Sequence, residues 1–371
     1  MLYDRRDSAL LHLAGTLHWL PLAPLRTLSP LGELAHEAEL LATLGLLTYA
    51  RSRAYLMPSP KGYAQLRAMH LPCRPPAKRP YTGSPALRRR LETGSILLTC
   101  LAAGITPAWD EIKRLCGQPL FFPAFPLRSG DGNLLGASVC AGFGHWGDTA
   151  YLIQYVSQES SGFFMTNELA NLHRLSSAFD PTCTTPQALI LAGQSYRAVF
   201  SVLTREEPSP RHGRKGYVDY SQAYPRLELP VCLLSCDDTG ALQLAVMRQA
   251  DFPTRIARAA FGSRWRPRDD RIPDADGQVD GNPLVIAVDM DLRRLDRVCR
   301  QAAAQGRREI LVAALEGQMN GLLLDVLPRG LPVRPLAVNP RVLSVAFGAD
   351  CATGIPWSDE PLHTKDGLVH V

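Results

Sequence analysis

The first 70 residues carry apolar positions at helical spacing, followed by a stretch in which the period changes. Leucine and alanine recur three and four positions apart, which is typical of helices that bury one face. This spacing predicts three helices, at residues 9–17, 25–28 and 29–45. Ser29 followed by Pro30 is a favourable start for the third helix, because serine caps a helix and proline fits its first turn.

Two short strand-like runs follow the third helix, at residues 46–49 and 54–57. The connection between them carries Arg51 and Arg53, so the pattern predicts a β-hairpin with basic residues near its tip. Ser59, again followed by proline, predicts the start of a fourth helix. The order of three helices, a hairpin and a fourth helix is that of a winged helix-turn-helix.

The remainder of the chain mixes strand-like and helix-like runs. Strands are predicted at residues 137–141, 149–156, 188–192, 196–203, 230–234, 284–288 and 310–314. Helices are predicted at residues 84–103, 106–115, 166–175 and 292–304. One more helix is predicted after the strand at 310–314, and it ends at about residue 322. Alternation of strands and helices after residue 284 predicts a partly parallel sheet. The expected fold class is therefore mixed, α+β and α/β, with an N-terminal winged helix.

Polar and proline-rich stretches suggest where the chain divides. We expect loops at 205–224 and 262–282. The predicted divisions are a winged-helix domain at 1–72, a basic proline-rich linker at 73–83, a helical and then mixed α/β domain at 84–204, an α/β region at 225–350 and a weakly ordered tail at 351–371.

Positive charge is concentrated at the start of the chain. The 371 residues carry a net charge of +5, and residues 1–80 contain ten basic and five acidic residues, which accounts for all of it. A further basic run, Arg88-Arg89-Arg90, follows closely. Local charge of this kind favours a polyanionic partner through counterion release.

The cysteines and the hydropathy pattern bear on the compartment. Nine cysteines, an odd number, are scattered through mostly apolar stretches, which is typical of reduced buried thiols. No run of eighteen apolar residues occurs. We therefore expect a cytoplasmic protein without a membrane span, and we expect no cofactor.

Two strings of residues carry a resemblance to known proteins. LGLL at 44–47 and SPKGYAQL at 59–66, separated by the hairpin, resemble bacterial winged-helix proteins over roughly residues 7–70. With the basic linker and the helix after it, the layout resembles the replication-relaxation family of plasmid and integrative-element proteins. This resemblance implies a DNA-binding protein of a mobile element, acting in plasmid replication, conjugative mobilisation or transcriptional control.

In winged-helix modules the third helix enters the major groove and the wing contacts the backbone or the minor groove. This analogy and the basic runs give the candidate DNA-binding residues His36, Leu40, Arg51, Arg53, Lys61, Arg67, Lys78, Arg79, Arg88, Arg89 and Arg90. The third helix also exposes Glu33 and Glu37, and carboxylates oppose phosphate binding. The basic runs still make double-stranded DNA the expected partner, and proteins of a replication or mobilisation complex are possible further partners. The acidic third helix supports the alternative, a scaffold that binds proteins.

Catalytic chemistry has only weak candidates, and we expect the C-terminal α/β region to be non-catalytic. Asp289 and Asp291 follow a buried strand and could bind a divalent cation, which would make the chain a metal-dependent nucleic-acid enzyme. A helix cap at Asp291 is the simpler interpretation. A nuclease-like core needs an acid-x-lysine string on a strand, and the string Glu111-Ile112-Lys113 lies in a predicted helix.

Three further patterns in the sequence bear on catalytic chemistry. Asp148 and Glu168 flank the strand at 149–156 as carboxylates without a lysine, so a degenerate nuclease-like core stays open. Cys140 and His145 would form a thiol pair only if the fold brings them together. The glycine-rich stretch 142–147 is neither a dinucleotide nor a Walker motif and predicts a sharp turn between strands.

Overall fold

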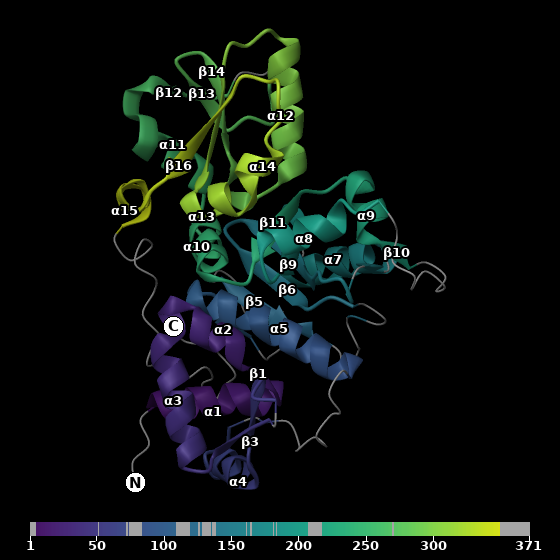
Figure 1. The fold of residues 1–371 in the computed structure, drawn as a ribbon, viewed down its shortest axis with the longest axis vertical. Coiled ribbons are helices and arrows are strands. Elements are labelled where there is room, and N and C mark those ends of the chain that lie inside the picture. Colours follow the sequence, from purple (N-terminus) through teal and green to yellow (C-terminus); the bar gives the residue numbers. More distant parts are fainter. Residues whose placement is uncertain are drawn as a thin grey trace.

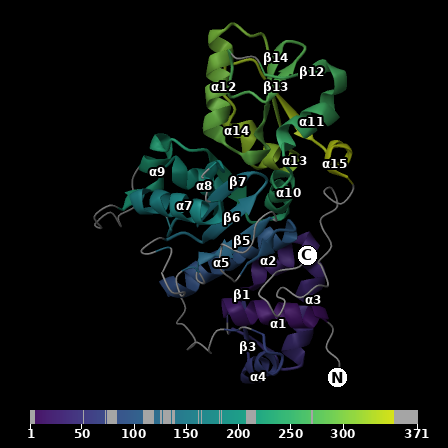
Figure 2. The same ribbon diagram turned by 180° about the vertical axis from the view of Figure 1, so that it is seen from behind.

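The fold is that of a computed structural model, in which three regions follow one another along the longest axis (Figure 1). A helical N-terminal region lies at one end, a six-stranded sheet with its helices lies in the middle, and a five-stranded sheet lies at the other end. Figure 2 shows the same succession from behind. The structure describes residues 5–50, 52–71, 73, 84–108, 119–124, 127, 135, 139–160, 162–163, 165–180, 182, 184–206, 217–268 and 271–348.

The N-terminal region contains the helices and the hairpin that the apolar spacing predicts. In chain order its elements are α1 (Arg5–Leu17), β1 (Leu20–Pro21), α2 (Leu22–Thr27), the 3₁₀ turn η1 (Ser29–Leu31), α3 (Gly32–Thr43), β2 (Leu47–Tyr49), β3 (Tyr55–Pro58) and α4 (Pro60–Ala68). The strands form an antiparallel sheet in the order β1-β3-β2, with Thr48 opposite Met57. Leu10, Leu13 and Leu17 on α1 are almost completely buried, as their spacing predicts.

Helix α5 (Pro85–Ala102) joins this region to the middle sheet. Ser84 accepts the backbone N–H of Leu87 at 3.4 Å and caps the helix. A Cβ atom on Gly94 would lie 2.7 Å from Cδ of Pro21, so the glycine permits close packing of α5 on β1. The predicted helix at 84–103 is confirmed.

The middle sheet is mixed, and helices cover both of its faces. Its strands are β4 (Thr106–Pro107), β5 (Leu120–Pro123), β6 (Gly142–Trp146), β7 (Thr149–Tyr155), β9 (Gln187–Gly193) and β11 (Val231–Ser235), in the order β11-β9-β7-β6-β5-β4. Strands β7, β9 and β11 are parallel, and β5, β6 and β7 are antiparallel. Helices α5 and α10 (Asp238–Met247) pack with one core, and α7 (Met165–Phe179) and α8 (Tyr196–Leu203) with the other. Beside them lie β8 (Gly162–Phe163), β10 (Val218–Asp219), α9 (Tyr220–Ala223) and η3 (Tyr224–Arg226).

The C-terminal sheet contains the predicted parallel strands. Its strands are β12 (Trp265–Arg266), β13 (Gly277–Val279), β14 (Asn282–Ile286), β15 (Ile310–Leu315) and β16 (Val333–Val338), of which the last three are parallel. Around them lie α11 (Phe252–Phe261), η4 (Gly262–Arg264), η5 (Ala287–Asp289), α12 (Leu292–Ala304), α13 (Glu316–Gln318), the π-helical turn η6 (Met319–Leu323), α14 (Leu324–Val326) and α15 (Pro340–Phe347). The fold is thus mixed α/β with partly parallel sheets. No helix in the described ranges is long and apolar enough to cross a membrane.

Residues 196–203 form helix α8 and not the predicted strand. Ser195 accepts a backbone N–H three residues further on, at 3.2 Å, and so caps the helix. Its buried side chains include Tyr196, Val199 and Val202, which recur every three residues. The strand prediction is wrong because the preference of β-branched and aromatic residues for strands is weak. The Ser195 cap and the packing of the buried side chains outweigh it and favour a helix.

The glycine-rich stretch 142–147 is strand β6 for five of its six residues, and only Gly147 belongs to a turn. The predicted sharp turn is present, but only at the end of the stretch, where Gly147, with φ of +50°, and Asp148 join β6 to β7. The rest is strand, because Gly142 and Gly144 make room for aromatic rings. A Cβ atom on Gly144 would lie 2.0 Å from the Trp146 ring. Of the strand predicted at 137–141, residues 139–141 precede β6 without being part of it, and residues 137–138 lie outside the described residues.

Three further predictions differ from the structure. The helix predicted at 106–115 begins as strand β4, because Ala108 donates its backbone N–H to Phe121 at 2.8 Å and the chain joins the sheet edge; residues 109–118 lie outside the described residues. The loop predicted at 262–282 contains strands β12 and β13, which pair with each other. The middle sheet also takes in β11, which lies beyond the division expected between residues 204 and 225.

Candidate nucleic-acid interface

The turn between α3 and β2 is held by the first residues of α4. Ser59 donates its hydroxyl to the carbonyl of Gly45 at 2.5 Å and its backbone N–H to Leu46 at 2.9 Å. The same hydroxyl oxygen accepts the backbone N–H of Gly62 at 3.0 Å. Ser59 therefore caps α4 and joins it to the end of α3.

Gly62 and Lys61 complete this junction. A Cβ atom on Gly62 would lie 2.2 Å from the carbonyl oxygen of Leu46, so only glycine fits. Lys61 donates from Nζ to the carbonyl of Leu44 at 2.9 Å, near the C-terminal end of α3, where a cation is favourable. The two strings that carry the family resemblance are thus in contact, and their residues fix α3 against the hairpin and α4.

The outer face of α3 carries the two sequence-predicted residues of this helix. Leu34 and Leu41 are buried, whereas His36 is exposed and Leu40 is 46% exposed. Glu33 is exposed on the same helix, so the face presented to solvent is acidic and partly apolar. Phosphate groups would be repelled by its carboxylates.

Basic residues lie on other elements of the N-terminal region. Arg53 is exposed at the hairpin tip with φ of +51°, and Arg67 is exposed on α4. Arg26 on α2 pairs with Glu39 on α3 at 3.5 Å, between side chains that are both about half exposed. Such an exposed pair contributes little to stability. The predicted contacts Arg51, Lys78 and Arg79 lie outside the described residues.

The basic run on α5 divides into three different environments. Arg88 is half-buried and pairs with Glu92 at 3.9 Å, and Arg89 is exposed. Arg90 lies with its guanidinium 4.5 Å from the centre of the Trp19 ring and 2.9 Å from Nδ1 of His18. Burial lowers the pKa of Arg90. Arg90 therefore packs α5 against the N-terminal region, which leaves Arg89 as the exposed member of the run.

A second contact fixes the N-terminal region on the middle sheet. The Asp238 carboxylate, in the first turn of α10, accepts the backbone N–H of Ser29 at 2.7 Å and its hydroxyl at 2.5 Å. The expected cap by Ser29 on the third helix does not form, because the hydroxyl is used by this carboxylate. The sequence gives no signal for this contact, which joins residues 209 positions apart.

The metal hypothesis for Asp289 and Asp291 does not fit the geometry. Asp291 is 4% exposed and accepts the backbone N–H groups of Arg293 and Arg294 at 3.1 and 3.0 Å, so it caps α12 as the simpler interpretation expects. Arg294 contacts Asp289 at 3.1 Å and Asp276 at 2.8 Å, so a guanidinium provides the positive charge there. Burial raises the pKa of Asp291. Within the described ranges, no group of three or more candidate ligands could hold a metal ion.

The fold does not bring together Asp148 and Glu168, or Cys140 and His145. Asp148 precedes the first residue of β7, whereas Glu168 accepts the backbone N–H of Val139 near the other end of that strand. Seven residues of strand span about 23 Å. Cys140 precedes β6, and His145 lies near the end of it, stacked on Phe179 with ring centres 4.0 Å apart. Glu111 and Lys113 lie outside the described residues.

The carboxyl ends of the parallel strands meet in a buried polar network. Tyr196 donates its hydroxyl to Gln243 at 2.8 Å, and Gln243 donates to the carbonyl of Leu233 at 2.9 Å. Gln318 donates to the carbonyl of Val288 at 2.8 Å. Side chains of the protein itself therefore occupy the place at which open α/β sheets commonly bind ligands.

Comparison with known proteins finds no relative that shares this arrangement. No family model matches the chain, and neither the curated proteins nor the solved structures provide a match. The resemblance to the replication-relaxation family therefore stays a hypothesis carried by the sequence layout.

Proposed function

We propose that residues 5–71 form a winged helix and that the chain is a non-catalytic DNA-binding protein. The observation that supports this best is the order of α1, β1, α2, α3, β2, β3 and α4 together with the strand order β1-β3-β2. In winged-helix proteins this order places the third helix beside the wing, so that both reach the duplex. A role in the replication or mobilisation of a plasmid follows from the layout resemblance alone.

On this proposal, α3 contributes shape and the surrounding elements contribute charge. His36 and Leu40 would meet base edges, while Arg53 on the hairpin and Arg67 on α4 would meet phosphates. Because Glu33 repels phosphate, we expect the basic residues of the hairpin and of α4 to provide most of the affinity. Binding should then be strongly dependent on salt.

The test is fluorescence anisotropy of a duplex of about 30 base pairs with the full chain at several salt concentrations. We expect Arg53→Gln combined with Arg67→Gln to weaken binding and to lower the salt slope by about two. The matched control combines Arg226→Gln with Arg329→Gln, two exposed arginines outside this region. Equal binding by both double variants would overturn the assigned interface.

A second candidate function is protein binding through α3, which the exposed Leu40 within an acidic face favours. A partner would then carry a basic rim around an apolar pocket. No duplex binding by the unaltered chain even at low salt, with the fold intact, would favour this candidate over DNA binding.

A further inference from the structure

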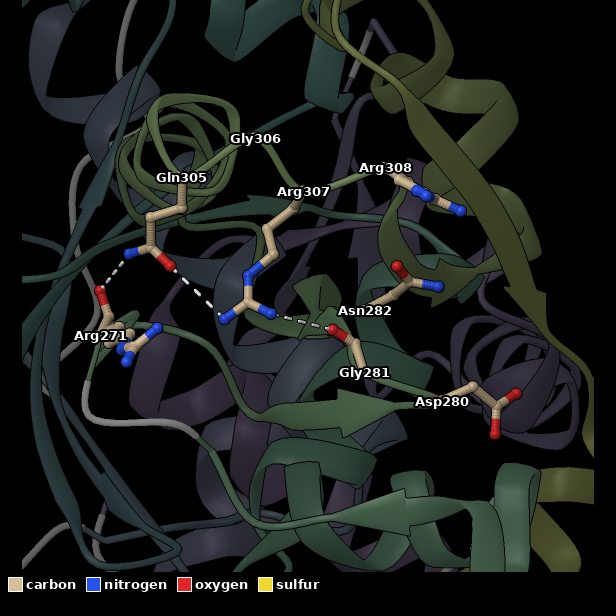
Figure 3. Close-up of a pocket in the computed structure, with 8 residues that line it drawn as sticks. All are labelled: Arg271, Asp280, Gly281, Asn282, Gln305, Gly306, Arg307 and Arg308. Carbon is tan, nitrogen blue, oxygen red and sulfur yellow. Dashed lines mark hydrogen bonds between the residues drawn. The ribbon is translucent and has the colours of Figure 1, made fainter.

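A hollow of about 580 Å³ lies at the end of the C-terminal sheet where the parallel strands β14 and β15 begin (Figure 3). Three arginines line it: Arg271, which precedes β13, and Arg307 and Arg308, which follow α12. Its volume falls in the range of small-molecule sites, roughly 300–1,000 Å³. No part of the proposed N-terminal interface reaches it.

Both walls of the hollow have fixed backbone geometry. One wall is the turn between β13 and β14, in which Asp280 and Gly281 have φ of +51° and +81°, as a tight two-residue hairpin turn requires. The other wall is the end of α12, where Gly306 has φ of +62° and Arg307 donates its backbone N–H to Ala302 at 3.0 Å. This is the Schellman ending of a helix. The hollow therefore exists in the folded chain without rearrangement.

Side chains tie the two walls together. Arg307 donates to the carbonyl of Gly281 at 3.4 Å and to Oε1 of Gln305 at 3.5 Å. Gln305 in turn donates to the carbonyl of Arg271 at 2.8 Å, as Figure 3 shows. A Cβ atom on Gly281 or Gly306 would meet no other atom within 4 Å, so the space above both glycines is open.

The described lining residues include one carboxylate, and it is already engaged. Asp280 accepts from Nε of Arg264 at 3.0 Å, and this bond lowers the pKa of Asp280. The remaining charged groups of the lining are guanidinium groups. Arginines just after a helix also interact favourably with its C-terminal dipole. Arg271 comes from another segment and lines the same hollow, so the guanidinium groups are not all supplied by one helix end.

We propose that this hollow is a binding site for a phosphate-type oxyanion. Guanidinium groups bind such oxygens with charge-assisted hydrogen bonds, and Asn282 and Gln305 bring amide groups to the same space. The anion is either a stretch of nucleic-acid backbone or a free phosphorylated small molecule. The site is independent of the winged-helix proposal, because no residue is shared.

The first experiment is a calorimetric titration of pyrophosphate into the full chain. We expect Arg271→Gln combined with Arg308→Gln to weaken pyrophosphate binding at least about tenfold, since both changes remove charge-assisted hydrogen bonds to the anion. These two side chains are exposed, so the fold should persist, and thermal unfolding checks this. The matched control is Arg329→Gln combined with Arg341→Gln, which removes the same charge from the same region.

The second experiment distinguishes the two sources of the anion. If nucleic acid is the ligand, the variant with Arg271→Gln and Arg308→Gln also loses affinity for the duplex, and pyrophosphate competes with the duplex for the chain. If a free phosphorylated molecule is the ligand, duplex binding is unchanged while pyrophosphate binding is lost. Loss of duplex binding in the Arg53 and Arg67 variant, with pyrophosphate binding retained, would separate the two proposals. Absence of pyrophosphate binding, or an equal loss in the control, would overturn this one.

Discussion

Gly62 provides a sharp test of how the N-terminal region is held, because two simple arguments predict opposite signs. Gly62 lies in the first turn of α4, and helix propensity alone predicts that alanine there stabilises by up to about 1 kcal/mol. The structure predicts the reverse. A Cβ atom would lie 2.2 Å from the carbonyl oxygen of Leu46, which is backbone and already accepts the N–H of Ser59 at 2.9 Å.

The size of the effect follows from what must move. Relief of the clash shifts the first turn of α4 away from Leu46, which breaks one hydrogen bond of Ser59 and weakens that of Lys61. Each such bond contributes about 1 kcal/mol, and forcing a methyl group into a packed site costs about 1–3 kcal/mol. After subtraction of the propensity gain, we expect Gly62→Ala to lower the free energy of unfolding by about 2–3 kcal/mol.

Urea denaturation of the full chain, followed by far-UV circular dichroism and tryptophan fluorescence, measures this difference. Gly32→Ala is the control, since its backbone is already right-handed helical, with φ of −57° and ψ of −39°, and a Cβ atom there would meet nothing within 4 Å. We expect Gly32→Ala to leave stability unchanged or to raise it by up to about 1 kcal/mol. A Gly62→Ala chain as stable as the unaltered one would refute the proposed junction.

Two further predictions concern buried charges. Burial raises the pKa of Glu92, whose carboxylate accepts from the Ser160 hydroxyl at 3.2 Å. The folded chain therefore binds a proton at Glu92 more tightly than the unfolded chain does. Stability falls as the pH rises from the ordinary glutamate pKa through the raised one. Glu92→Gln should therefore be more stable than the unaltered chain at neutral pH, with the difference vanishing below the ordinary glutamate pKa; urea midpoints at several pH values measure this, and a pH-independent difference would contradict it. Arg294→Met should lower the free energy of unfolding by about 3–5 kcal/mol, because it leaves Asp276 and Asp289 without their buried counter-charge. Calorimetry checks the second prediction, which fails if the variant melts with the unaltered chain.

Local signals were sufficient for much of the secondary structure. Serine or aspartate caps at Ser59, Ser84 and Asp291 begin helices where the sequence predicts them, because a cap depends on residues three positions apart. The wrong secondary-structure predictions fall where residues distant in the sequence determine the local conformation. Residues 196–203 form a helix and 142–146 a strand because of what packs against them, and a local period cannot report such packing.

The candidate sites were harder to predict than the secondary structure. A count of charges along the sequence does not distinguish an arginine that packs inside the fold from one that is exposed. Arg90 belongs to a run of three, yet its guanidinium lies on Trp19, a ring 71 positions earlier in the chain. Residues 81–371 contain equal numbers of basic and acidic residues, so composition directs attention only to the N-terminal fifth. The positive hollow arises because the end of α12 brings Arg307 beside the segment of Arg271, while Arg264 engages Asp280. A balanced total charge is therefore compatible with a concentrated local one, and only the fold determines where that concentration lies.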